Sequence, residues 1–232
     1  MSSPNSTDLH TDPKLFSGVD VYAVAGNPIA HSKSPVIHQA FAEQAKQKMH
    51  YGRLQPDMNS FSEAAKSFFA AGGKGLNVTV PFKLDAQAFA EVLSVRAQLA
   101  GAVNTLWIKN GKVFGDNTDG SGLVRDFLAQ GIAIHQSRIL LLGAGGAARG
   151  VTGPLLEQSP KCLVIANRTS AKAVELVKGL LQSVGARDIV ARLKCVGGIQ
   201  TDVEARMGPE AVNSPPDLFK TAADILSHTG AD

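Results

Sequence analysis

The sequence predicts an α/β fold made of two domains, the second of which is incomplete. Short apolar runs rich in β-branched residues alternate with segments in which apolar residues recur at helical spacing. The run at 138–142 is of the buried parallel-strand type, and a glycine-rich loop follows it at once. Beyond about residue 179 neither periodicity continues. We expect a flexible tail at 1–17, domains at 18–135 and 136–180, and a diverged or poorly ordered tail at 181–232.

Composition and charge exclude several classes of protein. A hydrophobic content of 44% suits a folded core, and the formal charge of +3 comes without the basic stripe and interleaved aromatic residues that are typical of nucleic-acid binding. No apolar stretch has the length of a membrane span, and residues 1–17 lack the pattern of a signal peptide. Cys162 and Cys195 are too few for a disulfide framework. We expect a cytoplasmic protein with small anionic ligands and with no nucleic-acid, membrane or metal partner.

The first domain is expected to alternate strands with helices. Strands are predicted at 19–25, 50–54 and 76–80, and helices at 36–48, 59–71 and from 81, with a new cap at Ser94 and an end at Gly101. The apolar faces of the first two helices comprise Val36, Ile37, Ala40, Phe41 and Ala45, and Phe61, Ala65, Phe68 and Phe69.

Pro81 marks a sharp turn after the strand at 76–80. Proline cannot continue a strand ladder but suits the first turn of a helix. The turn directs Thr79 and Lys83 toward the sheet edge where open α/β sheets hold their ligands. On its own, a lysine at a helix start is more often a solvated side chain.

Two hydroxyl groups lie in the loop after the first strand. Ser34 precedes Pro35, a pairing typical of a helix N-cap. Alternatively, Ser32 and Ser34 together grip a hydroxyl or carboxylate of a small polar ligand. Both interpretations fit the residues taken alone.

A hairpin is predicted at 104–115 because Asn110-Gly111 supplies the two positive-φ residues of a type I′ turn. Its two ends lie side by side, so Asn104 is expected near the run 116–120. Asp119 in that run is either a functional carboxylate or the N-cap of a helix at 121–130.

The strand at 138–142 opens a nucleotide-binding unit. In the loop that follows, Gly143 and Gly145 allow a tight turn and close backbone approach to a pyrophosphate, and Ala148 takes the close-packing position. After the next strand, at 162–166, Arg168 and Thr169 stand where an NAD enzyme carries an acidic residue, and they suit a 2′-phosphate. We therefore predict NADP as the cofactor. The residues predicted to bind it are Gly143, Ala144, Gly145, Gly146, Ala147, Asn167, Arg168, Thr169 and Lys172.

Six blocks in this order resemble the shikimate dehydrogenase family over residues 19–178. They are Gly26-Asn27-Pro28 with Ser32-Lys33-Ser34-Pro35, Asn77-Val78-Thr79-Val80-Pro81-Phe82-Lys83, Gly101-Ala102-Val103-Asn104-Thr105, Asn117-Thr118-Asp119-Gly120, the glycine loop, and Asn167-Arg168-Thr169. The resemblance implies an N-terminal substrate-binding α/β domain plus an incomplete Rossmann-like NADP-binding domain. It also implies a role in aromatic amino acid biosynthesis through chorismate.

The resemblance assigns roles to named side chains. It implies that Ser32, Ser34, Thr79, Lys83, Asn104 and Asp119 surround shikimate or 3-dehydroshikimate. Lys83 is then the candidate base for the ring hydroxyl, with Asp119 orienting the exchange and Asn104 fixing the substrate. A second copy of the chain, forming a homodimer, is also an expected partner.

The chain departs from the family near Gly179, where further strands and a returning last helix are expected but not found. A frameshifted or truncated copy and a diverged relative both fit, and the weak periodicity of the tail favours the former. Alternatives to an active shikimate dehydrogenase are a non-catalytic remnant that binds shikimate or a nucleotide, and a quinate/shikimate dehydrogenase.

Overall fold

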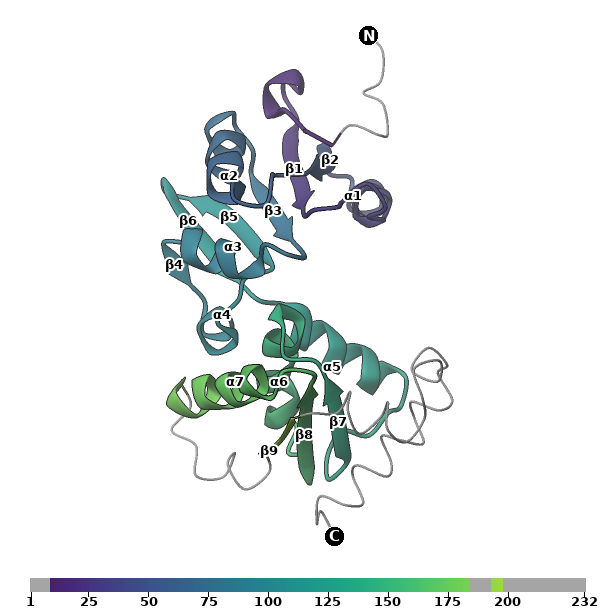
Figure 1. Ribbon diagram of the computed structural model, residues 1–232. Coiled ribbons are helices and arrows are strands. Elements are labelled where there is room, and N and C mark those ends of the chain that lie inside the picture. The colour runs from purple at the N-terminus through teal and green to yellow at the C-terminus, as the bar shows by residue number, and fades with distance from the viewer. Residues whose placement is uncertain (1–8, 184–192, 198–232) are drawn as a thin grey trace. The chain divides into compact units, whose positions relative to one another are not determined.

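The computed structural model describes residues 9–183 and 193–197, which form two compact units that divide between Thr118 and Asp119 (Figure 1). The first unit comprises η1 (Pro13–Leu15), β1 (Asp20–Ala25), α1 (Ser34–Ala45), β2 (Met49–Leu54), α2 (Phe61–Ala70), β3 (Gly75–Val78), α3 (Lys83–Phe89), β4 (Val92–Leu93), α4 (Val95–Ala100), β5 (Thr105–Lys109) and β6 (Lys112–Asp116). The second comprises α5 (Asp119–Ala129), β7 (Arg138–Leu142), α6 (Gly146–Glu157), β8 (Cys162–Asn167), α7 (Ser170–Ser183) and β9 (Leu193–Gly197).

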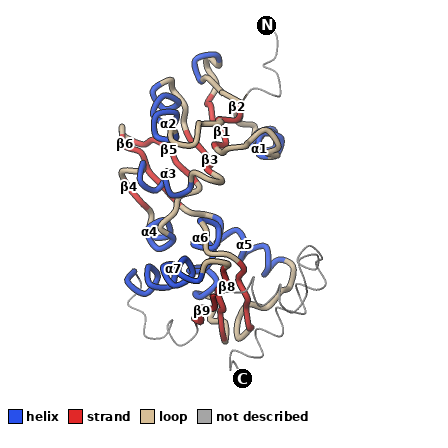
Figure 2. Tube along the Cα trace, viewed as in Figure 1, coloured by secondary structure: helices blue, strands red, loops and turns tan. Residues whose placement is uncertain are grey.

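The first unit is built on a six-stranded sheet in the order β2-β1-β3-β5-β6-β4 (Figure 2). Strands β1, β2 and β3 are parallel to one another, and β5 runs antiparallel to both β3 and β6. One sheet face packs on α2, α3 and α4 and forms the main core of this unit. The predicted core face of α2 is confirmed, because its four apolar residues Phe61, Ala65, Phe68 and Phe69 are buried.

The segment after β3 is arranged differently from the prediction. The Val80–Pro81 peptide is cis, and α3 begins only at Lys83, so Pro81 lies in the turn before the helix and not in its first turn. Ala90 has extended φ and ψ angles and ends α3. Residues Val92–Leu93, which we expected to be helical, instead pair with Phe114 and Gly115 of β6. Pairing with a neighbouring strand therefore overrides the local helical pattern.

Residues 10–16 are ordered against the sheet, which corrects the flexible tail expected at 1–17 for this stretch. The amide of Thr11 donates to the Arg53 carbonyl at 3.0 Å, and the ring of Phe16 stacks on that of His50 at 3.8 Å. Gly52 leaves the room for this contact, because an added Cβ there would lie 1.9 Å from Thr11 Oγ1. The segment covers the edge strand β2, whose backbone groups would otherwise be unpaired.

The apolar residues of α1 do not face the sheet. Ala42 is its buried residue, whereas Val36, Ile37 and Phe41 are exposed to 68, 47 and 57%. The helix itself was predicted correctly, but its apolar pattern does not mark the face that packs on β1 and β2.

The second unit holds a parallel sheet in the order β7-β8-β9 among the described residues. Strand β8 is buried on both faces, as its continuous apolar run predicts. Helix α5 belongs to this unit, so the division comes before the boundary at 135 that we expected. The reason is packing: Val124 and Ile134 form a cluster with Leu155 of α6. Residues 1–8 and most of the tail predicted at 181–232 lie outside the described residues.

Helices α5 and α6 pack closely at Gly120. A Cβ at Gly120 would lie 2.4 Å from the carbonyl oxygen of Gly150 and 2.6 Å from Pro154 Cγ, whereas one at Gly122 would meet nothing within 4 Å. Gly120→Ala should therefore lower the free energy of unfolding by about 1–3 kcal/mol. Gly122→Ala, two residues further along the same helix, should raise it by about 0.5–1 kcal/mol. Urea unfolding followed by circular dichroism measures both, and equal effects would contradict the packing described.

Candidate active site

The residues predicted to bind substrate collect at one edge of the six-stranded sheet. The parallel strands β1 and β3 both end there, and the antiparallel strand β5 begins there. After β1 come Ser32, in the loop, and Ser34, the first residue of α1. After β3 come Thr79, in the turn, and Lys83, the first residue of α3, and Asn104 immediately precedes β5. Five predicted side chains from three separate stretches of sequence therefore share this edge.

Backbone contacts hold these stretches against one another. The Thr79 amide donates to the Ala25 carbonyl at 2.9 Å, and an added Cβ at Gly26 would lie 2.6 Å from Thr79 Cγ2. A glycine is therefore needed where the two loops meet. The carbonyl of Lys83 accepts from the Val103 amide at 2.9 Å, which fixes the start of α3 beside the residue that precedes Asn104.

The structure decides between the two interpretations of Ser34. Helix α1 has Lys33 as its N-cap and no side-chain cap hydrogen bond, so the interpretation of Ser34 as the cap is wrong. Ser32 Oγ instead accepts from the Ser34 amide at 3.3 Å, and Arg53 donates to the Ser32 carbonyl at 2.9 Å. Both serines are half-buried, and the Ser32 hydroxyl, not that of Ser34, accepts from the first amide of the helix.

Asn104 joins the two ends of the predicted hairpin. Its Nδ2 donates to Thr118 Oγ1 at 3.0 Å, and its Oδ1 accepts from the Thr118 amide at 3.0 Å. The turn residues Asn110 and Gly111 have φ angles of 52° and 74°, as the type I′ turn requires. Asp119 follows Thr118 directly and is the first residue of α5, so that helix begins two residues before the predicted start at 121.

A buried carboxylate beside Asn117 and Thr118 was not predicted from the sequence. Asp116 is 9% exposed and accepts from Ser94 Oγ, from the Arg96 guanidinium and, at 2.7 Å, from the Asn117 amide. Burial raises the pKa of Asp116, but the hydrogen bonds from Arg96, Ser94 and Asn117 outweigh it and hold the pKa below its ordinary value. The charged carboxylate thus anchors the end of β6 that leads into Thr118.

The predicted nucleotide-binding residues also share an edge, that of the second unit. Leu142 of β7 pairs with Ala166 of β8, so the glycine loop and Asn167 follow neighbouring strand ends. Gly143 has a φ of +110°, and Gly145 is the N-cap of α6 with open space where a Cβ would stand. That space allows a phosphate to approach the first amides of the helix. Beyond Asn167, the predicted residues Arg168, Thr169 and Lys172 are all exposed.

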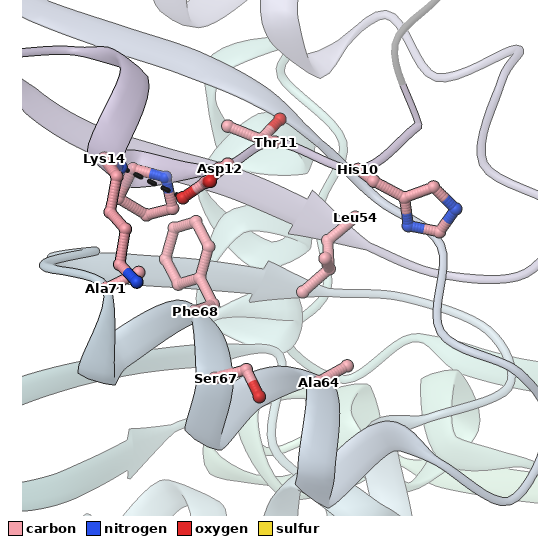
Figure 3. Close-up of a pocket in the computed structure, with 10 residues that line it drawn as sticks. His10, Thr11, Asp12, Lys14, Leu54, Ala64, Ser67, Phe68 and Ala71 are labelled. Carbon is pink, nitrogen blue, oxygen red and sulfur yellow. Dashed lines mark hydrogen bonds between the residues drawn. The ribbon is translucent and has the colours of Figure 1, made fainter.

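A separate cavity of about 310 Å³ lies in the first unit, between the segment that contains η1 and helix α2 (Figure 3). Its lining includes His10, Asp12, Lys14, Ser67 and Phe68. Asp12 Oδ1 accepts from the Lys14 amide at 3.0 Å within this lining. None of the side chains predicted to bind substrate contributes to it, so this cavity is not the predicted site.

Within 9–183 and 193–197, no group of three or more His, Cys, Asp or Glu side chains could hold a metal ion. None of the described helices has both the length and the apolar character needed to cross a membrane.

Comparison with known proteins points to one family. Residues 24–106 match the family model described as the shikimate dehydrogenase substrate binding domain, and residues 127–196 match the one described as shikimate / quinate 5-dehydrogenase. The shikimate dehydrogenase (NADP(+)) of Vibrio atlanticus is 54% identical over 177 residues, which cover 74% of this chain and 64% of that protein. The chain spans about three fifths of the length of the curated relatives that it matches.

Solved structures agree. The shikimate dehydrogenase of Aquifex aeolicus superimposes with a TM-score of 0.69 and 30% identity, covering 82% of this chain and 67% of that one. A second is the Thermus thermophilus shikimate 5-dehydrogenase in complex with NADP(H) and shikimate. It superimposes with a TM-score of 0.65 and 33% identity, covering 70% and 61% of the two chains.

The depressed pKa of Asp116 predicts how stability depends on pH. A carboxylate whose pKa is lowered by folding stabilises the protein above its unfolded value, 3.8, and this contribution is lost as pH falls through the folded value. Asp116→Asn should lower the free energy of unfolding by about 1–3 kcal/mol at neutral pH and by less near about pH 2. Urea titrations at both pH values measure the difference.

Asp57→Asn is the matched control, because Asp57 lies exposed in a loop of the same unit. It should change stability by less than about 0.5 kcal/mol at either pH. An equal loss in both variants, or a loss in Asp116→Asn that does not vary with pH, would contradict the role given to Asp116.

Proposed function

Because this chain belongs to the shikimate dehydrogenase family, we propose that it catalyses the reversible NADP-dependent reduction of 3-dehydroshikimate to shikimate. The observation that supports this most strongly is the gathering of Ser32, Ser34, Thr79, Lys83 and Asn104 at one sheet edge. The reaction would serve aromatic amino acid biosynthesis through chorismate. Both substrates are small polar metabolites, and we propose a cytoplasmic location.

Substrate recognition is assigned to hydroxyl and amide groups. The Ser32 and Ser34 hydroxyls suit a carboxylate, and Thr79 and Asn104 suit the ring hydroxyls, since these side chains both donate and accept hydrogen bonds. Asn104 is held by hydrogen bonds to Thr105 and Thr118. A side chain fixed in this way orients a substrate at little entropic cost.

Proton transfer is assigned to Lys83 and Asp119. Oxidation of the shikimate hydroxyl releases a proton, and the amine of Lys83 is the proposed acceptor. The hydrogen bond from the Val103 amide to the Lys83 carbonyl supports this role, because it keeps the backbone of Lys83 close to Asn104. Asp119 is one residue from Thr118, which holds Asn104, and its carboxylate is proposed to orient the exchanging proton.

NADP is assigned to the second unit. When bound, it supplies the hydride acceptor or donor for the ring carbon. The proposed contacts are the amides of 143–147 with the pyrophosphate, and Asn167, Arg168, Thr169 and Lys172 with the adenosine ribose and its 2′-phosphate. The positive φ of Gly143 and the open space at Gly145 support a phosphate at this loop.

A second candidate function is shikimate binding without turnover. It is supported by the placement of Ser32, Ser34, Thr79, Lys83 and Asn104 in the first unit, while the residues proposed to bind NADP belong to the second. Quinate is an alternative substrate, since one matching family model covers both shikimate and quinate enzymes.

Replacement of the proposed base tests the activity. Lys83→Ala should lower kcat for NADP-dependent oxidation of shikimate by about 10²–10⁴-fold, the usual contribution of a positioned acid or base. NADP affinity should not change. Both are measured from NADPH absorbance and by calorimetric titration. Near-normal turnover in Lys83→Ala would rule out the assigned role, while shikimate binding without turnover in the unsubstituted chain would select the second candidate function.

We also propose that two copies of the chain associate through α1. The stripe of Val36, Ile37 and Phe41 is exposed, and isolated exposed patches of this kind mark interfaces. Lys33 lies one turn before the stripe and Glu43 follows it, so an antiparallel two-fold pairing brings each lysine to the glutamate of the second copy.

The molar mass in solution tests this pairing. The chain should sediment with a mass twice its 24.3 kDa, and Phe41→Ser should reduce the mass to that of one chain. Leu128→Ser, which replaces a similarly exposed residue of α5, is the control and should leave the mass unchanged. A single-chain mass for the unsubstituted protein at high micromolar concentration would refute the proposed dimer.

A further inference from the structure

A chain of side-chain hydrogen bonds runs across the first sheet and ends at Asn104. Tyr51 Oη on β2 donates to Asn77 Oδ1 on β3 at 2.7 Å. Asn77 Nδ2 donates to Thr105 Oγ1 at 3.5 Å, and Thr105 Oγ1 donates to Asn104 Oδ1 at 2.8 Å. Asn77 and Thr105 are directly paired residues of β3 and β5, so this part of the chain follows the strand register.

The hydrogen bonds of this series all run in one direction, from donor to acceptor, toward Asn104. The backbone N–H of Thr118 can only donate, so the Asn104 atom that faces it at 3.0 Å is the acceptor Oδ1. Thr105 must then also donate to Oδ1, which leaves its oxygen to accept from Asn77 Nδ2. The Oδ1 of Asn77 is thereby aimed at Tyr51, whose phenol supplies the first proton of the series.

The Tyr51 ring is itself fixed. It is 6% exposed and stacks on the His38 ring with centroids 4.0 Å apart and planes 11° apart. His38 Nδ1 lies 2.9 Å from the carbonyl oxygen of Ser34. Burial raises the pKa of Tyr51 above its ordinary value, so the phenol keeps its proton at neutral pH and can donate it. Tyr51 thus stands between the serine loop and the series that ends at Asn104.

We propose that Tyr51 is a positioning residue that holds the Asn77 side-chain amide and, through Thr105, supports the orientation of Asn104 that the Thr118 amide defines. By donating to Asn77 Oδ1, it keeps Asn77 Nδ2 toward Thr105 Oγ1, so that Thr105 keeps its own proton for Asn104 Oδ1 and Asn104 presents Nδ2 as a donor. The consequence for substrate rests on the proposed function: Nδ2 then offers a hydrogen bond to a ring oxygen of shikimate. Sequence patterns give no hint of this role, because Tyr51, Asn77 and Thr105 come from three strands.

Tyr51→Phe removes the first donor and keeps the ring. The side-chain amide signals of Asn104 and Asn77 in a ¹H–¹⁵N spectrum of the full chain should shift or broaden, and this readout requires no ligand. Shikimate affinity should fall about 5–10-fold, as expected for one lost hydrogen bond, with NADP affinity unchanged. Tyr22→Phe is the matched control, because Tyr22 pairs with Tyr51 on the adjacent strand and forms no side-chain hydrogen bond among the described residues.

Thr105→Val removes the hydroxyl that links Asn77 to Asn104. It provides the same test if Tyr51→Phe does not fold. If both residues act through one chain, the double variant should lose no more shikimate affinity than the weaker-binding single variant. Unshifted Asn104 signals in Tyr51→Phe, or additive losses in the double variant, would overturn the proposal. Shifted Asn104 signals in a chain that binds no shikimate would support the positioning role and refute the proposed function instead.

Discussion

The structure of the candidate site depends on the mixed pairing of one sheet. Strands β1 and β3 are parallel, so their ends share an edge, and β5 runs the opposite way and begins at that same edge. This constraint brings together three stretches that are far apart in the sequence. The close approach of the loops at Gly26 and the backbone bond from Val103 to Lys83 then fix their spacing. The directions of the strands decide which residues lie at this edge, and the packing of the loops fixes the distances between them.

Strand direction also places the predicted nucleotide-binding residues of the second unit, where the described strands are all parallel. Parallel strands β7 and β8 end side by side, and the glycine loop opens α6 where they end. An anion can meet the first helix amides there, and the neighbouring strand end contributes Arg168 and Thr169. The residues proposed to bind shikimate and those proposed to bind NADP belong to different units, so binding of each ligand can be measured separately from turnover.

The predictable parts of the fold were those fixed by local chemistry. The type I′ turn at Asn110-Gly111, the glycine loop and the buried run of β8 require little more than their own residues, and the structure confirms each one. The predictions were wrong where contacts with distant parts of the chain determine the local structure. Strand β4 forms because β6 lies beside it, residues 10–16 are ordered by the edge of β2, and α5 joins the second unit through contacts with α6.

The candidate site shows the same division. Motif residues such as Lys83 and Asn104 could be named from the sequence, whereas Asp116 and the series from Tyr51 to Asn104 could not, since their partners are defined only by the sheet. The most direct test of the account is a titration of the chain with shikimate followed by backbone amide NMR. The largest shifts should fall at 26–34, 79–83, 103–105 and 118. Shifts confined to the cavity lined by residues 10–14 and α2, or no shifts at all, would contradict it.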